Sequence, residues 1–341
     1  MDNLAHTLVG AALGRAVADR HVPLASVIGA VAANAPDWTE LLIGLPSTPD
    51  KYLVLHRGIT HSLLGALVQI FALMLLVGAS WRISSRPPWR WLLACIGTAI
   101  LSHLFMDWQG SYGWRPFLPW NSGWYYLDWV AIVDVFFWIV PLLALAWGAN
   151  RHWLPLSVTM LTAAAMTLIV TLARDAAALW VLVAFAAALI VGVVGWIRYW
   201  VGPVARQRAA VVALVLLGTY SVAQGVAAHG RKTEIRNEAQ RRFGKDATWA
   251  ALTKIGRPFT WEAMYASPDT VAGEDWRLPR HLRLPAVRRA ISETPDGRAI
   301  AQFARFLAAE VDTTDTAIYL RDARYARTRR DGWAVVRVRM E

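Results

Sequence analysis

The stretch Ser62-Leu-Leu-Gly-Ala-Leu-Val-Gln-Ile-Phe-Ala-Leu-Met-Leu-Leu-Val-Gly-Ala-Ser-Trp81 contains twenty residues and no charged side chain. As a helix it would rise about 30 Å, which is the thickness of the hydrocarbon core of a bilayer. Similar apolar runs of roughly 18 to 22 residues recur along the chain up to about Ala228 and then stop. The stretch therefore predicts a membrane helix, and its recurrence predicts a polytopic membrane protein.

The apolar segments divide into a short hairpin and a series of longer runs. The hairpin is predicted over residues 4–20 and 22–36. Longer helices are predicted at 62–81, 90–108, 129–148, 153–173, 176–197 and 208–228. From Gly230 onward the composition is that of a soluble domain. The predicted fold class is therefore an all-α polytopic membrane domain of about six to eight hydrophobic helices, followed by a small α+β soluble domain.

Three parts of the chain follow from this pattern. We expect residues 1–148 to form a helical membrane domain that carries the polar site residues, and 149–229 to add further transmembrane helices. Residues 230–341 are expected to form the soluble C-terminal domain. Within that domain, hydrophobic periodicity predicts helices at 233–243 and 298–309, and strands at 316–325 and 333–339 around a turn at Asp331-Gly332.

Composition and charge agree with a membrane protein. The chain is 56% hydrophobic and only 17% charged, whereas soluble domains carry about 25% charged residues. The net charge of +11 arises from basic residues that flank apolar runs or lie in the tail, so we expect the bilayer and not a nucleic acid as the partner. The single Cys95 excludes an intrachain disulfide and a cysteine-based zinc site. The first residues do not resemble a cleavable signal peptide.

The basic residues of the short loops predict an orientation. Counting them places the N-terminus, the loops 37–61 and 109–127, and the tail on the outer side. A cluster that directly follows the last apolar run would instead prefer the cytoplasm, and it leaves the side of the tail open: Arg231, Lys232, Arg236, Arg241 and Arg242.

Histidine and aspartate recur at one end of the predicted helices. The set is His6, Asp37, His56, His61, His103 and Asp107, with Asp128 and Asp134 as further candidates. In the hairpin topology all of these lie at the same membrane face. Imidazole and carboxylate are ligands of zinc and similar divalent ions, and a bound ion lowers the pKa of its water toward neutrality. The pattern therefore predicts a hydrolytic metal site.

One neighbour of these residues is expected to bind substrate, and some of the candidate ligands taken singly could have a structural role instead of binding metal. Arg57 is suited to an anionic substrate group because a planar guanidinium matches phosphate. Taken alone, a histidine at a helix end is more often an interfacial residue than a ligand, and Asp37 after Pro36 could cap a helix. Asp134 lies inside an apolar run, where an acid is functional by default, although it could also pair with an arginine.

The motifs resemble those of the YdjM-type membrane-bound metal-dependent hydrolases. The resemblance is carried by His6-Thr-Leu-Val-Gly, Pro36-Asp37, His56-Arg-Gly-Ile-Thr-His-Ser, Ser102-His-Leu-Phe-Met-Asp, Tyr112-Gly-Trp-Arg-Pro-Phe and Leu127-Asp-Trp-Val-Ala-Ile-Val-Asp. It covers roughly residues 1–140 and implies that His6, Asp37, His56, His61, His103 and Asp107 are metal ligands. That family is remotely similar to the zinc-dependent phospholipase C and P1 nuclease group. One departure is Thr39, which stands where the family often has a second aspartate, with Glu40 one residue later.

Three functions remain open on this basis. The first is a membrane-embedded hydrolase of the cell (inner) membrane that acts on a phosphoester or lipid-like ester, with zinc as the expected ion and Asp37, Asp107 and Arg57 as catalytic residues. The second is a metal-binding transporter or sensor. The third is an assembly factor whose tail binds a partner protein.

Overall fold

The computed structural model describes residues 1–39, 49–80, 88–147, 153–198, 202–330 and 332–339. The chain forms two compact units. The helical unit comprises Met1–Pro36, Ile59–Val226 and Thr253–Thr260. The mixed unit comprises Asp37–Gly58, Ala227–Leu252 and Trp261–Glu341.

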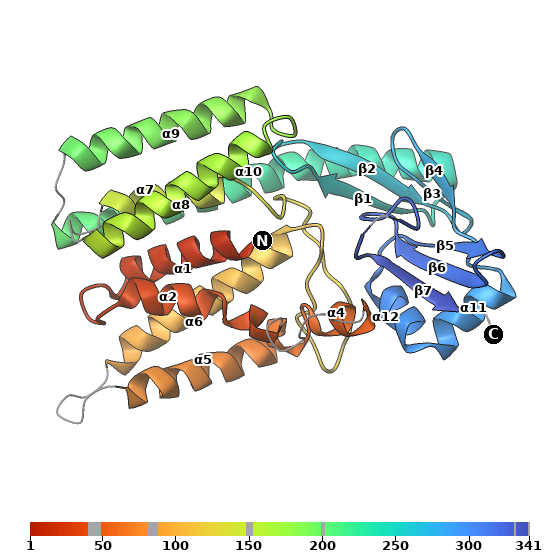
Figure 1. Cartoon of the computed structure of the whole chain (residues 1–341), viewed down its shortest axis with the longest axis horizontal. Helices are drawn as coiled ribbons and strands as arrows, with labels where there is room; N and C mark the ends of the chain where they lie inside the picture. The colour runs from red at the N-terminus through yellow and green to blue at the C-terminus, as the bar shows by residue number, and fades with distance from the viewer. Residues whose placement is uncertain (40–48, 81–87, 148–152, 199–201, 331, 340–341) are drawn as a thin grey trace. The chain divides into compact units, whose positions relative to one another are not determined.

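Apolar helices build the helical unit (Figure 1). They are α1 (Asn3–Ala18), α2 (Ala25–Ala33), α5 (Leu63–Ala79), α6 (Trp89–Gln109), α7 (Phe136–Trp147), α8 (Trp153–Leu172), α9 (Leu179–Arg198) and the first part of α10 (Pro203–Phe243). Two short 3-10 helices lie within the polar motifs, namely η1 (Ala35–Asp37) and η2 (Ile59–His61). Each predicted apolar segment is thus observed as a helix.

Only some of the apolar helices in the described part of the chain are candidates for membrane spans. Among the described residues, two helices are long and apolar enough to cross a bilayer, Trp89–Gln109 and Val204–Phe243. A third is added if α5 and the bent helical segment before it cross as one. Shorter apolar helices lie at Phe136–Trp147, Ser157–Leu172 and Leu179–Gly195. The six to eight spans of the predicted fold class therefore stay a prediction.

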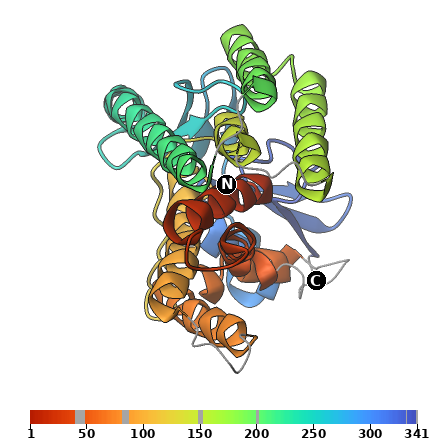
Figure 2. The ribbon, with the colours of Figure 1, turned by 90° about the vertical axis from the view of Figure 1, so that its left-hand side faces the viewer.

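Helix α1 lies in the middle of the unit and packs against α2, α6 and α7, as the nearly end-on view shows (Figure 2). Its contact with α2 is made by small residues. A Cβ atom on Gly14 would lie 2.0 Å from the carbonyl oxygen of Ala25, and one on Gly10 would lie 2.4 Å from Ala33 Cβ. Such small residues let two helix backbones approach closely. The hairpin thereby brings both of its members against α6.

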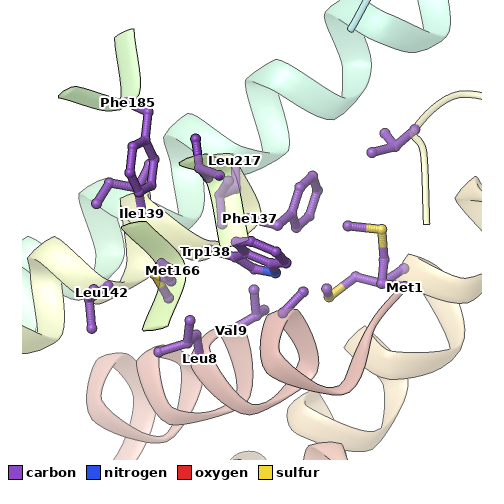
Figure 3. Close-up of a cluster of buried hydrophobic side chains, with 14 residues drawn as sticks. Met1, Leu8, Val9, Phe137, Trp138, Ile139, Leu142, Met166, Phe185 and Leu217 are labelled. Carbon is purple, nitrogen blue, oxygen red and sulfur yellow. The ribbon is translucent and has the colours of Figure 1, made fainter. Parts of the chain in front are cut away.

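A hydrophobic cluster joins α1 to the later helices (Figure 3). Trp138 of α7 lies between α1, where Leu8 and Val9 contribute, and the region of Phe137 and Leu217. The indole N–H of Trp138 also donates to Asp2 Oδ1 at 3.0 Å, and Asp2 in turn caps α1 by accepting from Ala5 N–H. This packing fixes the start of α1, and with it the position of His6.

The mixed unit contains two antiparallel sheets and short helices. The first sheet has the order β1 (Thr248–Thr253), β2 (Trp261–Ala266), β3 (Thr270–Ala272) and β4 (Arg277–Pro279). The second has the order β5 (Leu307–Asp312), β6 (Ala317–Asp322) and β7 (Val335–Arg339). The helices are α4 (Pro49–Leu55), α11 (Pro285–Glu293) and α12 (Pro295–Phe303), and α4 packs against α12.

Several predicted boundaries were wrong. Helix α7 begins at Phe136, seven residues later than predicted, because the N–H groups of Trp129 and Val130 donate to Gln109 O instead of entering a helix. The predicted helices 208–228 and 233–243 are parts of the single helix α10.

In the tail, residues 307–309 belong to strand β5 and not to the predicted helix, since they pair with residues 320–322 of β6. The strands predicted at 316–325 and 333–339 are confirmed as β6 and β7. Asp331 of the predicted turn lies outside the described residues.

Candidate metal centre

Four of the predicted side chains meet inside the helical unit. His6 comes from α1, His61 from η2, and His103 and Asp107 from successive turns of α6. Each of the four is at most 2% exposed. The i, i+4 spacing places His103 and Asp107 on one face of α6, with His103 Nε2 lying 3.4 Å from Asp107 Oδ2.

The ligand atoms form a compact triangle. His61 Nε2 lies 3.1 Å from His103 Nε2 and 3.5 Å from Asp107 Oδ2. On the other carboxylate oxygen, His6 Nε2 lies 3.4 Å from Asp107 Oδ1. Donor atoms that surround a tetrahedral zinc ion at 2.0–2.1 Å are about 3.3 Å apart. The observed separations therefore match the edges of such a coordination polyhedron.

A backbone carbonyl defines the tautomer of His103. Its Nδ1 lies 2.7 Å from the carbonyl oxygen of Ala33, which can only accept a hydrogen bond. Nδ1 therefore carries the proton, which leaves Nε2, the atom that faces His61 and Asp107, as the ring nitrogen that can bind an ion. Metal-ligating histidines commonly donate their second N–H to a carbonyl in this way. The close packing of α1 on α2 thus has a role at the site, because it holds Ala33 in place.

The loop after α6 positions His61. The indole N–H of Trp114 donates to the carbonyl oxygen of His61 at 2.5 Å. One residue beyond the motif, Leu63 N–H donates to Pro116 O at 2.9 Å, and Ser62 caps α5 by accepting from Gly65 N–H. Trp114 itself is paired with Tyr125 through two backbone hydrogen bonds. The sequence motif containing Trp114 was noted, but its role was missed, since no spacing rule links it to a carbonyl more than fifty residues away.

His6 has an unusual environment for a buried polar side chain. Its ring stacks on that of His103 with centroids 3.8 Å apart, and neither of its ring nitrogens forms a hydrogen bond. Leaving a buried donor or acceptor unsatisfied costs about 1–3 kcal/mol. The amino group of Met1 lies 2.6 Å from Asp107 Oδ1, so a positive charge already faces this carboxylate.

These residues fit a divalent transition metal ion. The set of three imidazoles and one carboxylate is a donor set that zinc accepts, and His6, His103 and Asp107 have ligand atoms close enough to share an ion. One of the two orphaned nitrogen atoms of His6, Nε2, which faces Asp107, would gain a partner on binding. The geometry therefore supports a buried metal site.

Three other predicted residues belong to the mixed unit. Asp37 ends η1, His56 follows α4 and stacks on Tyr52 with centroids 4.9 Å apart, and Arg57 is buried with a left-handed backbone. Tyr52 also meets Trp333 edge-on, so the tail contacts α4, the helix that directly precedes His56. The ligand roles of Asp37 and His56 and the catalytic role of Arg57 stay predictions. Glu40, the displaced second acid, lies outside the described residues.

The further candidates Asp128 and Asp134 are buried but are not among the His/Asp groups that converge in the described part of the chain. Asp134 is surrounded by donors. It accepts from Phe136 N–H at 2.9 Å, Tyr220 O–H at 2.7 Å and Gln224 Nε2 at 3.4 Å. Asp134 therefore links α7 to α10, an observation that favours a structural role over metal binding.

Comparison with known proteins gives the family. The model of the YdjM inner membrane protein family matches residues 1–229, which is the whole helical region up to the middle of α10. The chain belongs to this family. It is accordingly a protein of the inner membrane, and its apolar helices agree with that location. No curated protein and no solved structure shows significant similarity to it. The remote similarity to zinc-dependent phospholipase C and P1 nuclease stays a prediction.

Proposed function

We propose that this YdjM-family protein is a membrane-embedded metal-dependent hydrolase of a phosphoester or lipid-like ester, with zinc as its ion. The observation that supports this most directly is the triangle of His61 Nε2, His103 Nε2 and Asp107 Oδ2, with sides of 3.1–3.5 Å. Three mutually close ligand atoms in a buried site favour a cation with several coordination positions over separate ion pairs.

The chain's own residues would divide the work as follows. His6, His61, His103 and Asp107 would hold the ion, with Asp37 and His56 as additional ligands. The bound ion would supply Lewis acidity and lower the pKa of a coordinated water. Asp37 or Asp107 would accept the proton of the attacking water, and Arg57 would hold an anionic group of the substrate. Trp114 and Ala33 would keep His61 and His103 oriented.

The first test is elemental analysis of the detergent-purified protein. We expect stoichiometric zinc or another transition metal in the wild type, and loss of most of it in His61→Ala/His103→Ala. His229→Ala is a matched control, because His229 is exposed on α10 and distant in sequence from the cluster. If the wild type binds no more metal than the double variant after reconstitution with excess ions, the hydrolase proposal is wrong.

Activity is tested next on a panel of chromogenic phosphomonoesters, phosphodiesters and carboxylic esters presented in mixed micelles. Turnover that follows the metal content and is lost in His61→Ala/His103→Ala would support hydrolysis. Metal binding without turnover of any ester would favour the metal-binding transporter or sensor. Absence of both, together with a phenotype confined to tail variants, would favour the assembly factor.

A further inference from the structure

A loop of the C-terminal region belongs to the helical unit. The segment Thr253–Thr260 connects β1 to β2, and it packs on the turn between α8 and α9. Ala178 N–H donates to Gly256 O at 2.9 Å, and Arg257 Nε donates to Ala176 O at 3.2 Å. Gly256 permits this approach, because it has a φ of +72° and a Cβ atom there would lie 2.9 Å from Ala177 Cα.

Three further contacts hold the same loop. Phe259 N–H donates to the side-chain oxygen of Gln224 at 2.9 Å, and its ring lies edge-on to Tyr220. At the other end of the loop, Thr253 N–H donates to Ser111 Oγ at 3.3 Å. The loop is therefore fixed to α10, to the α8–α9 turn and to the segment that follows α6.

The loop Thr253–Thr260 and the adjoining ends of α8 and α9 expose both apolar and basic side chains. Leu172 and Leu179, at the facing ends of α8 and α9, are each 76% exposed, and Ile255 is 51% exposed. Trp180 and Phe259 are also exposed, as are Arg174 and Arg257. We call this set of seven residues the interfacial patch. Aromatic and basic residues at the ends of apolar helices are typical of the headgroup layer of a bilayer.

We propose that the interfacial patch lies in the headgroup layer of the inner membrane, with Ile255 at the ends of the acyl chains and with Arg174 and Arg257 binding the phosphate of anionic phospholipids. Three observations support it. The apolar members of the patch are too exposed for a water-facing surface, and α8 and α9 are apolar helices whose ends meet there. The two guanidinium groups, opposed by the exposed Asp175 that lies 3.8 Å from Arg174 Nε, give the patch a net positive charge that complements an anionic headgroup.

This placement also sets the depth of the metal centre. Thr253 is bonded to Ser111, which lies four residues beyond Asp107 along the chain. The end of α6 that carries Asp107 would therefore lie close to the level of the lipid headgroups. A phosphoester or ester group of a lipid would reach that level without leaving the membrane. The placement stands independently of catalysis, since it rests on the patch and not on the metal.

Site-directed spin labelling tests the depth of Ile255. Cys95 is the only cysteine and is fully buried, so a Cys95→Ala background accepts a single new cysteine. Labels at Ile255→Cys and Leu179→Cys are compared with one at Thr313→Cys, an exposed polar position between β5 and β6, in nanodiscs of phosphatidylethanolamine and phosphatidylglycerol. We expect the first two labels to be relaxed more by oxygen than by a water-soluble nickel complex, and the third to show the reverse. Equal accessibility of the labels at 255 and 313 would overturn the proposal.

Lipid retention tests the two arginines. Native mass spectrometry of the protein released from the same nanodiscs counts bound phosphatidylglycerol in Arg174→Gln/Arg257→Gln. The control Lys245→Gln/Arg283→Gln removes the same charge from exposed positions of the mixed unit. We expect a loss of roughly fivefold in lipid affinity for each patch arginine, which corresponds to the usual attraction of one basic residue to an anionic surface. Equal retention by both double variants would contradict headgroup binding by the patch.

Discussion

Asp107 and Asp134 are both buried carboxylates of the helical unit, and their surroundings differ in kind. Asp134 accepts hydrogen bonds from a backbone N–H, a tyrosine hydroxyl and a glutamine amide. Asp107 faces the Nε2 atoms of three histidines at 3.4–3.5 Å, in addition to the Met1 amino group. Neutral donors complete the first carboxylate, whereas the second shares its space with the lone pair of His103 Nε2 and with the ring nitrogens of two further histidines.

The difference follows from the donor and acceptor inventory of the neighbours. A hydroxyl or an amide N–H can satisfy a carboxylate without any additional species. A neutral imidazole whose Nδ1 is protonated, such as His103 against Ala33, has only a lone pair left at Nε2. Several such atoms around a carboxylate are stable when a cation lies among them. Burial of an acid in a membrane protein therefore does not by itself indicate a metal site, and the type of neighbour does.

The largest expected effect is on metal binding, which should depend on Asp107 and not on Asp134. Asp107→Asn removes a charged ligand and should lower bound metal by more than about tenfold, while Asp134→Asn should leave the metal content unchanged. Competitive titration with a chromophoric chelator measures both affinities in detergent. Equal metal affinities in the two variants would show that the neighbours do not distinguish the carboxylates, and the comparison would fail.

A smaller effect is expected where a residue orients a ligand without touching the ion. Trp114→Phe keeps the aromatic packing but removes the indole N–H that donates to His61 O. Loss of such a supporting hydrogen bond typically costs 10–100-fold in metal affinity, and we expect about tenfold here. Trp120→Phe is the matched control, since Trp120 lies in the same segment and is 77% exposed. An unchanged affinity in Trp114→Phe would mean that η2 is held by other contacts.

The sequence predicted the apolar helices, and it predicted that four of the candidate ligands lie close together, for a physical reason. Hydrophobic runs report membrane helices directly, and an alternating hairpin topology places His6, His61, His103 and Asp107 at one end. The role of Asp134 was not predictable, because its partner Tyr220 is more than eighty residues away and carries no motif. Strand β5 was missed since Leu307, Ala308 and Ala309 have helical propensity that pairing with β6 overrides.

The hydrogen bond of Tyr220 to Asp134 gives the third prediction. Tyr220→Phe retains the ring contacts with Phe136 and Phe259 and removes only the O–H donor. We expect the free energy of unfolding in detergent to fall by about 1 kcal/mol, as for a single lost hydrogen bond, with metal affinity unchanged. Tyr125→Phe is a control, because the structure shows no hydrogen bond from the Tyr125 hydroxyl within its described residues. A loss of metal in Tyr220→Phe would show that the two carboxylates are coupled.

The smallest effect concerns a carboxylate outside the bundle, Asp315, which serves as a solvent-facing reference for the two buried ones. Hydrogen bonds from Arg337 and Tyr319 lower the pKa of Asp315 below its ordinary value of 3.8. Because the folded state favours the ionised form, the contribution to stability is complete above the unfolded pKa and is lost as the pH falls through the folded pKa. The thermal midpoints of wild type and Asp315→Asn should therefore differ slightly at neutral pH and converge only as the pH falls below 3.8 and through the folded pKa. Solvent and salt screen this exposed group, so a difference that persists unchanged at acidic pH would place the effect of the substitution elsewhere than in the charge.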